Sequence, residues 1–298
     1  MRIKKRHLKR GLIALAIIIV IAIAYLLLQP KQETYGVDEQ GFLHAPTHTD
    51  LKATRTLLLS DENVTVYKTT YQSYGATVYG NLYVPRGVDA AHKATAMLLL
   101  PGGGVTKEAE GKAARAFAHR GYAVLTIDQR GVGETGGPFR SLSDDFYAWK
   151  AGQIPTQHLL VLDALAGIQF LREQPETGKV LLAGESMGGR AAMVAARISS
   201  DIGGLIVISS SGYGDLALPP DQKMFFTSFN PDANLALVRV PVLFLHSTND
   251  TTVPISYAQA TFGRVNGPKK FLTVDGCAHG YCAAMEPLLD EGLPWLMR

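Results

Sequence analysis

The chain contains little cysteine and little charge. Two cysteines among 298 residues cannot supply the disulfide framework of a small secreted domain. Charged residues make up 18% and hydrophobic residues 47% of the chain, which excludes a disordered protein. Glycine and proline follow no fixed period, which excludes a collagen-like fibre. The sequence therefore describes a globular protein that is long enough to bury a core of its own.

Positive charge is scarce outside the N-terminus. The net charge is +3, but six basic side chains lie in the first ten residues, so the rest of the chain carries a net charge of −3. A mildly acidic body has no field that attracts phosphates, and no basic face with interleaved aromatic residues is present. We therefore expect no nucleic-acid partner.

One long apolar run follows the basic residues. Residues 12–28 are all Leu, Ile, Ala, Val or Tyr, and as a helix they would cross roughly 26 Å of hydrocarbon. A cleaved signal peptide is the alternative, but Ala22 and Ala24, the candidate cleavage residues, are followed by further apolar residues. The pattern favours a single-pass membrane anchor, with residues 1–11 as a basic cytoplasmic tail and the rest of the chain outside. Residues 29–56 lack periodicity and are predicted to be a linker.

From residue 57 onwards, short strands alternate with helices. Two strands with alternating polarity, 64–71 and 76–84, precede a region of fully apolar strands and amphipathic helices. The predicted strands of that region are 94–100, 123–128, 180–184, 204–209, 241–247 and 270–274, and the predicted helices are 108–120, 156–173, 187–198, 255–264 and 283–296. This order predicts an α/β fold with a mostly parallel sheet and helices on both faces. In such sheets the functional site lies at the carboxyl ends of the strands.

A serine stands where one of these strands meets its helix. Residues 184–189 read Gly-Glu-Ser-Met-Gly-Gly. A strand that turns sharply into a helix needs residues without side chains two before and two after the serine, which leaves the hydroxyl exposed. Ser186 is therefore the predicted nucleophile. The alternative is a glycine-rich helix start with a serine N-cap.

A serine hydroxyl needs a base and an orienting carboxylate, which in this context follow in the order serine, acid, histidine. Two histidines lie downstream of the serine. His246 is inside a predicted strand and is interpreted as structural, whereas His279 lies in the loop after the last strand and is the predicted base. Asp250 follows the preceding strand and is the predicted acid. The rival acids are Asp275 and, more weakly, Asp215.

An acyl-transfer intermediate carries an oxyanion that needs two backbone N–H donors. Met187 offers one, because the first N–H groups of a helix have no partner within the helix. The other is expected from the glycine-rich loop 101–105, where we choose Gly103, with Gly104 as the near alternative. A flexible turn is the other interpretation of this loop.

Together these segments resemble the α/β-hydrolase superfamily, and within it the serine hydrolases related to the prolyl oligopeptidase, acetyl esterase and dienelactone hydrolase groups. The resemblance covers residues 57–298 and rests on segments 80–85, 128–136, 184–189, 250–254 and 279–280, which occur in family order. Two departures are Pro101, where the family often has His, and Ser247, where it commonly has Gly. The resemblance implies the α/β-hydrolase fold, serine chemistry without a cofactor, and loop-ordering roles for Asp128 and Arg130.

Two long predicted loops, 134–155 and 213–234, carry aromatic residues above the expected site. Their rings indicate either an apolar acyl or alcohol pocket or simple packing of the loops. No large cap or propeller domain fits into the chain, which favours small esters over peptides.

Cys277 and Cys282 flank His279. Whether they form a disulfide bond is left open, and a metal site is disfavoured because the cluster has one His and two Cys.

The sequence thus predicts a membrane-anchored serine hydrolase for carboxylic esters of small substrates, with Ser186, His279 and Asp250 as the triad and with neither cofactor nor metal. Its expected partners are a small ester or acyl substrate and the membrane. A prolyl-oligopeptidase-type peptidase, a thioesterase or acyltransferase, and an inactive hydrolase-like binding module are the alternatives. A glycosylation signal that begins at Asn249 overlaps the candidate acid, which favours a bacterial cell envelope over a eukaryotic secretory pathway.

Overall fold

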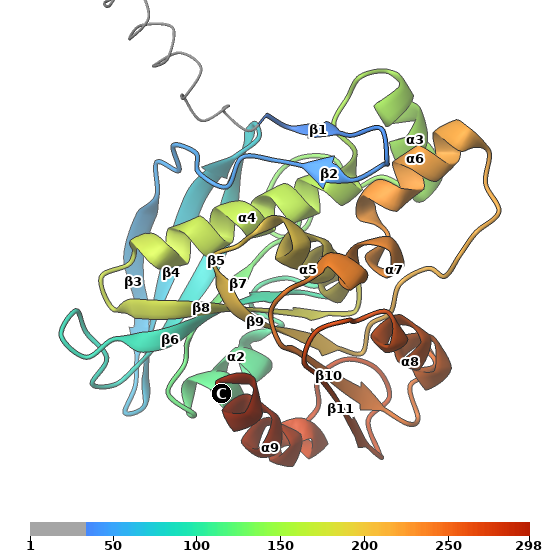
Figure 1. Ribbon diagram of the computed structural model, residues 1–298. Helices are drawn as coiled ribbons and strands as arrows, with labels where there is room; N and C mark the ends of the chain where they lie inside the picture. Colours follow the sequence, from blue (N-terminus) through green and yellow to red (C-terminus); the bar gives the residue numbers. More distant parts are fainter. Residues whose placement is uncertain (1–33) are drawn as a thin grey trace, which may run out of the picture. The chain divides into compact units, whose positions relative to one another are not determined.

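A nine-stranded sheet forms the centre of the structure, which is a computed structural model that describes residues 34–298 (Figure 1). The strands are β3 (Thr54–Ser60), β4 (Val64–Ser73), β5 (Ala76–Pro85), β6 (Ala94–Leu100), β7 (Ala123–Ile127), β8 (Thr177–Glu185), β9 (Ile202–Ile208), β10 (Val242–Ser247) and β11 (Lys269–Val274). Their order in the sheet is β11-β10-β9-β8-β6-β7-β5-β4-β3. The pairs from β7 through β11 are parallel, and the pairs among β3, β4, β5 and β7 are antiparallel. The predicted α/β fold with a mostly parallel sheet is confirmed.

Helices cover both faces of this sheet, because its central strands are apolar on both sides. Ala96, Leu98 and Leu100 of β6 pack into one core, and Met97 and Leu99 pack into the other. The first core is closed by α4 (Thr156–Glu173), α5 (Ser186–Ile198) and α8 (Ile255–Gly263), and the second by α2 (Gly111–Ala118) and α9 (Glu286–Leu296). The alternation follows from the two-residue period of a strand.

The folded unit begins earlier than the sequence pattern indicates. It extends from Tyr35 to the C-terminus, with a small hairpin of β1 (Gly36–Val37) and β2 (Leu43–His44) ahead of β3. Leu43 and Leu51 are 0% and 3% exposed and belong to the main core. The predicted linker 29–56 is therefore part of the packed domain from Tyr35 onwards.

Two helices occupy segments that were predicted as loops. They are α3 (Leu142–Lys150) and α6 (Pro220–Phe229), and α6 is followed by the short turns α7 (Pro231–Asn234) and η1 (Leu235–Leu237). Helices α3 and α6 contact each other and the first turns of α4, beside the carboxyl end of the sheet (Figure 1). A last short turn, η2 (Ala283–Met285), leads into α9.

The predicted membrane anchor, 12–28, and the basic tail, 1–11, lie outside the described residues. Within residues 34–298, no helix has the length and apolar character needed to span a membrane. The anchor therefore stays a prediction.

Candidate active site

Ser186 lies at the junction of β8 with α5, in a backbone conformation that an L residue seldom adopts. Its φ is +51°, in the left-handed region, where a residue with a side chain is strained. The neighbouring glycines make the turn possible. A Cβ on Gly184 would lie 2.4 Å from the carbonyl oxygen of Gly188, and a Cβ on Gly188 would lie 2.4 Å from that of Leu100. The sharp strand-to-helix turn predicted for residues 184–188 is present.

His279 and Asp250 meet at the same edge of the sheet. Nδ1 of His279 lies 2.8 Å and 3.0 Å from the two carboxylate oxygens of Asp250. The Asp250 side chain is fully buried, and its Oδ1 also accepts the backbone N–H groups of Thr252 and Val253, each at 2.9 Å. These bonds fix the carboxylate, which in turn fixes the ring so that Nε2 is directed away from the acid.

The loop that carries His279 is tied to the residue before the serine. The backbone N–H of Tyr281 donates to Oε2 of Glu185 at 2.7 Å, and Gly280, with φ +81°, packs so closely that a Cβ there would lie 2.4 Å from Oε1 of Glu185. Among residues 34–298 no hydrogen bond joins Ser186 Oγ to the imidazole. Contacts of this kind often tighten only when substrate is bound.

The rival residues make other hydrogen bonds, although Nε2 of His246 also lies 3.7 Å from Oδ2 of Asp250. His246 is fully buried in β10, where its Nε2 lies 2.8 Å from the carbonyl oxygen of Val253, and burial lowers its pKa. Asp275 is bonded to the hydroxyl of Thr248, and Asp215 is exposed and paired with Arg264. Neither Asp275 nor Asp215 bonds to His279.

The two predicted oxyanion donors lie side by side. A Cβ on Gly103 would lie 3.2 Å from Cε of Met187. In the same loop, the N–H of Gly102 donates to Oε1 of Glu110 at 3.3 Å, whereas no acceptor within residues 34–298 takes the N–H of Gly103. Met187 is the second residue of α5, so its N–H also lacks a partner within the helix. Both N–H groups are thus available to a developing oxyanion.

Two glutamates flank this loop, Glu110, which is buried, and Glu185, which is half-buried. Glu110 is 4% exposed, and burial, together with the negative charge of Glu185, raises its pKa to about 8. Burial raises the pKa of Glu185 as well, although the Tyr281 N–H and His279 oppose that rise. The raised pKa favours the protonated form of Glu110, whose carbonyl oxygen can still accept the Gly102 N–H.

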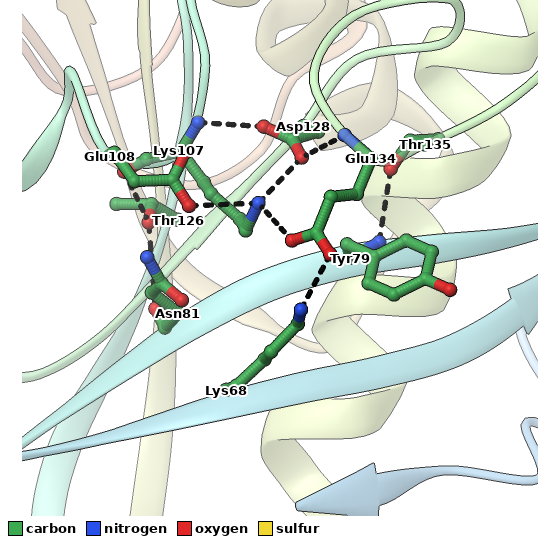
Figure 2. Close-up of polar contacts among 9 residues, drawn as sticks. All are labelled: Lys68, Tyr79, Asn81, Lys107, Glu108, Thr126, Asp128, Glu134 and Thr135. Carbon is green, nitrogen blue, oxygen red and sulfur yellow. Dashed lines mark hydrogen bonds and ion pairs between the residues drawn. The ribbon is translucent and has the colours of Figure 1, made fainter. Parts of the chain in front are cut away.

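A buried ion network anchors the far end of the glycine-rich loop (Figure 2). The ammonium of Lys107 lies 2.8 Å from Asp128 and from Glu134 and 2.9 Å from Glu108. Asp128 is fully buried and also accepts the N–H groups of Lys107 and Glu134. Burial alone would lower the pKa of Lys107, but the bonds to the carboxylates outweigh burial and raise it. Asp128 therefore joins the loops after β6 and β7.

The other residue for which the resemblance implied a loop-ordering role is Arg130. Its Nε and Nη2 each lie 2.7 Å from an oxygen of Asp163 in α4, and Nη2 also donates to the carbonyl oxygen of Ser73 at 2.6 Å. The paired side chains are each 2% exposed. This fork fastens the loop after β7 to a helix and to the end of β4.

Cys277 and Cys282 form a disulfide bond that brackets the loop of His279, with Cα atoms 6.0 Å apart. The aromatic residues of 134–155 and 213–234 pack the two segments together, which is one of the two interpretations that the sequence allowed. Phe146, Trp149 and Phe225 contact one another with tilted rings and centroids 5.6–6.2 Å apart. Beside them α3, α6 and residues 216–218 line a cavity of about 290 Å³. Within residues 34–298 no group of three His, Cys, Asp or Glu side chains is arranged to hold a metal ion.

Comparisons with known proteins bear on the fold of the chain. The sequence model of the family described as "Serine aminopeptidase, S33" matches residues 91–233. Acetyl xylan esterase 1 from Thermoanaerobacterium sp. JW/SL YS485 has a similar structure, with a TM-score of 0.67 and 16% identity over 84% of this chain and 89% of that chain. The acetyl xylan esterase from Paenibacillus sp. R4 gives 0.67 and 17% over the same shares. Est1E from Butyrivibrio proteoclasticus, a structure with bound ferulic acid, gives 0.60 and 18% over 76% and 98%. The chain has the α/β-hydrolase fold.

The fold that the resemblance implies is thereby confirmed, and no curated protein sequence matches this chain significantly. Sequence reasoning missed Glu110, Glu185 and Lys107. Glu185 stands inside the serine motif and could have been singled out as a charge beside the nucleophile. Nothing in the sequence indicates that Glu110 and Lys107 are buried, because each lies in a segment with an amphipathic pattern.

Proposed function

We propose that this α/β hydrolase is a serine hydrolase that cleaves carboxylic esters of small substrates. The observation that carries the proposal is the buried Asp250 bonded to His279 at 2.8 Å, at the sheet edge where Ser186 occupies a strained turn. The two acetyl xylan esterases of similar structure support an ester substrate.

In the proposed mechanism, Oγ of Ser186 attacks the carbonyl carbon of the ester while Nε2 of His279 accepts the hydroxyl proton. The N–H groups of Met187 and Gly103 bind the oxyanion that forms. Asp250 holds the ring and stabilises the imidazolium, which then gives its proton to the leaving alcohol. Water, activated by the same histidine, attacks the acyl-enzyme and releases the acid and the free serine.

The test is the intact mass of the full chain, extracted in detergent, after treatment with a fluorophosphonate. We expect a single adduct on the wild type, none on Ser186→Ala or His279→Ala, and an unchanged adduct on Ser200→Ala, a matched exposed serine. No adduct on a folded wild type would overturn the proposal and favour a binding module.

The substrate class needs a second measurement. The match to the serine aminopeptidase family favours a peptidase as the other candidate function. Para-nitrophenyl esters of graded acyl length, an aminoacyl para-nitroanilide and an acyl-CoA thioester separate the three reactions. We expect the esters to give the largest kcat/KM. A larger value for the anilide would replace the esterase proposal with the aminopeptidase.

The proposal includes attachment to a cell membrane through residues 12–28, with the catalytic domain on the outer side of a bacterial envelope. The apolar run and the basic residues before it support this arrangement. The full chain should stay in the membrane pellet after a carbonate wash, and external protease should reach the domain. Release of the full chain by carbonate would contradict the anchor.

A further inference from the structure

A cavity of about 410 Å³ lies at the carboxyl ends of β9 and β10, between α5, α7 and α8. Its wall includes Arg190 of α5, Tyr213 in the loop after β9, Asp232 of α7, and Arg264 after α8. The loop after β10 adds Thr252. The cavity is large enough for a small organic group, and the proposed mechanism assigns it no role.

The cavity borders the proposed catalytic residues. Arg190 follows Ser186 by four residues on α5, which places both on one face of the helix, and side chains of a helix lean toward its N-terminus. The backbone N–H of Thr252, a lining residue, holds Asp250. The hydroxyl of Ser210, next to the lining residue Ser211, donates to the carbonyl oxygen of Ser186 at 2.6 Å.

Arg190 is a charged residue of this cavity that has no ion-pair partner among the described residues. Its Nε donates to the carbonyl oxygen of Ser211 at 3.0 Å, and its guanidinium stacks 4.2 Å from the ring centroid of Tyr213. These two contacts hold the fork in place. In the part of the chain that the structure describes, no carboxylate lies within 4.0 Å of the Arg190 nitrogens, and the two terminal nitrogens donate to no acceptor.

The other charges of the cavity are already engaged. Arg264 lies 2.6 Å from Asp215, and Oδ2 of Asp232 accepts the backbone N–H of Gly214 at 2.7 Å. The unpaired positive charge of Arg190 lies in the same cavity as the carboxylate of Asp232. This combination suits a singly charged anion better than a dianionic phosphate. The two oxygens of a planar carboxylate also match the two terminal nitrogens of the Arg190 guanidinium.

We propose that Arg190 binds a free carboxylate of the substrate, so that the preferred esters carry a carboxylate besides the bond that is cleaved. This inference rests on the proposed function and names the substrate class of the same site. Half-esters of dicarboxylic acids and acyl esters of hydroxy acids belong to this class. Arg190 is then a specificity-determining residue one helical turn from the nucleophile.

The experiment measures kcat/KM of the full chain for two matched pairs of esters. The first pair, para-nitrophenyl pentanoate and mono-para-nitrophenyl glutarate, differs by a carboxylate in the acyl part. The second, phenyl acetate and para-carboxyphenyl acetate, differs by a carboxylate in the alcohol part. The readout is the ratio of the carboxylate ester to the neutral ester in the wild type, Arg190→Gln, Arg190→Lys and the control Arg264→Gln.

In at least one pair we expect Arg190→Gln to lower this ratio about tenfold, mainly through KM, because a partly buried ion pair is lost. Arg190→Lys should retain part of the ratio, and Arg264→Gln should leave it within about twofold. A ratio that Arg190→Gln leaves unchanged in both pairs, or that Arg264→Gln lowers equally, overturns the assignment while the esterase proposal stands. Absence of hydrolysis of all four esters overturns both.

Discussion

Asp250 and Asp275 lie on neighbouring strand ends, yet only Asp250 bonds to His279. Asp250→Asn keeps the size of the side chain but favours the wrong tautomer of the ring. We expect kcat for an activated ester to fall by about 10⁴-fold, as for triads in general. Asp275→Asn should change kcat by less than about twofold, because its side chain is exposed and bonds to Thr248, not to the ring. Equal losses in the two variants would contradict the assignment of the acid.

Glu110 makes the stability of the domain depend on pH. Its pKa is about 8 in the folded protein and near 4.3 in an unfolded chain. A raised pKa means that its contribution to stability is complete at low pH and decreases as the pH rises toward 8. Glu110→Gln removes this titration, so the variant should gain on the order of 3–4 kcal/mol relative to the wild type between pH 5 and pH 8.

Urea unfolding of the two proteins at these pH values measures the difference. Glu62→Gln, at an exposed turn residue, is the matched control and should follow the wild type at both pH values. If Glu110→Gln and the wild type lose the same stability between pH 5 and pH 8, then Glu110 is ionised in the folded protein and the structural interpretation is wrong.

At the scale of elements, the loop of His279 is held by a disulfide and by the Tyr281–Glu185 bond. The disulfide closes a loop of few residues, so replacing both cysteines with serine should lower the free energy of unfolding by only about 2 kcal/mol. The loop itself becomes freer, and we expect kcat to fall about tenfold with little change in KM. Wild-type protein treated with a reductant should show the same decrease in kcat. Unchanged kcat in both would show that hydrogen bonds hold the loop without the disulfide.

The ion network of Lys107 offers a second prediction for connecting loops. Asp128→Asn leaves the buried ammonium without its fully buried partner, and the loss of one partner of a buried ion pair typically costs about 3–5 kcal/mol of stability. Glu134→Gln removes a partner that is 44% exposed, and exposed ion pairs contribute about 1 kcal/mol or less. Chemical unfolding at pH 7 ranks the two variants. A similar loss for both would indicate that Glu134 shares the ammonium equally with Asp128.

Which elements could be predicted from the sequence follows from how they are buried. Strands β6, β7, β8, β9 and β10 can be predicted from their apolar runs, because both faces of these strands are covered by helices. Helices α3 and α6 are short and mix aromatic with acidic residues, so their pattern resembles a loop. The triad candidates follow from motif order and strand ends. The proximity of Glu110 to Glu185 cannot be predicted in this way, because only the fold brings together these two residues, which are 75 positions apart.

At the scale of the whole molecule, the earlier start of the domain predicts where the chain can be shortened. A protein that begins at Tyr35 keeps β1, β2 and every core residue of the folded unit. Its melting temperature should match that of the full chain in the same detergent. A protein that begins at residue 57 loses the buried Leu43 and Leu51 and half of β3, which exposes β4 as a new sheet edge.

Each of these leucines contributes about 1.5–3 kcal/mol of burial free energy. For a domain of this size 1 kcal/mol corresponds to about 2–4 °C. The protein that begins at residue 57 should therefore melt about 6–24 °C below the one that begins at Tyr35 and should aggregate more readily. Scanning calorimetry of both measures the difference. Equal melting temperatures would mean that residues 35–56 act as a linker, as their sequence pattern alone suggests.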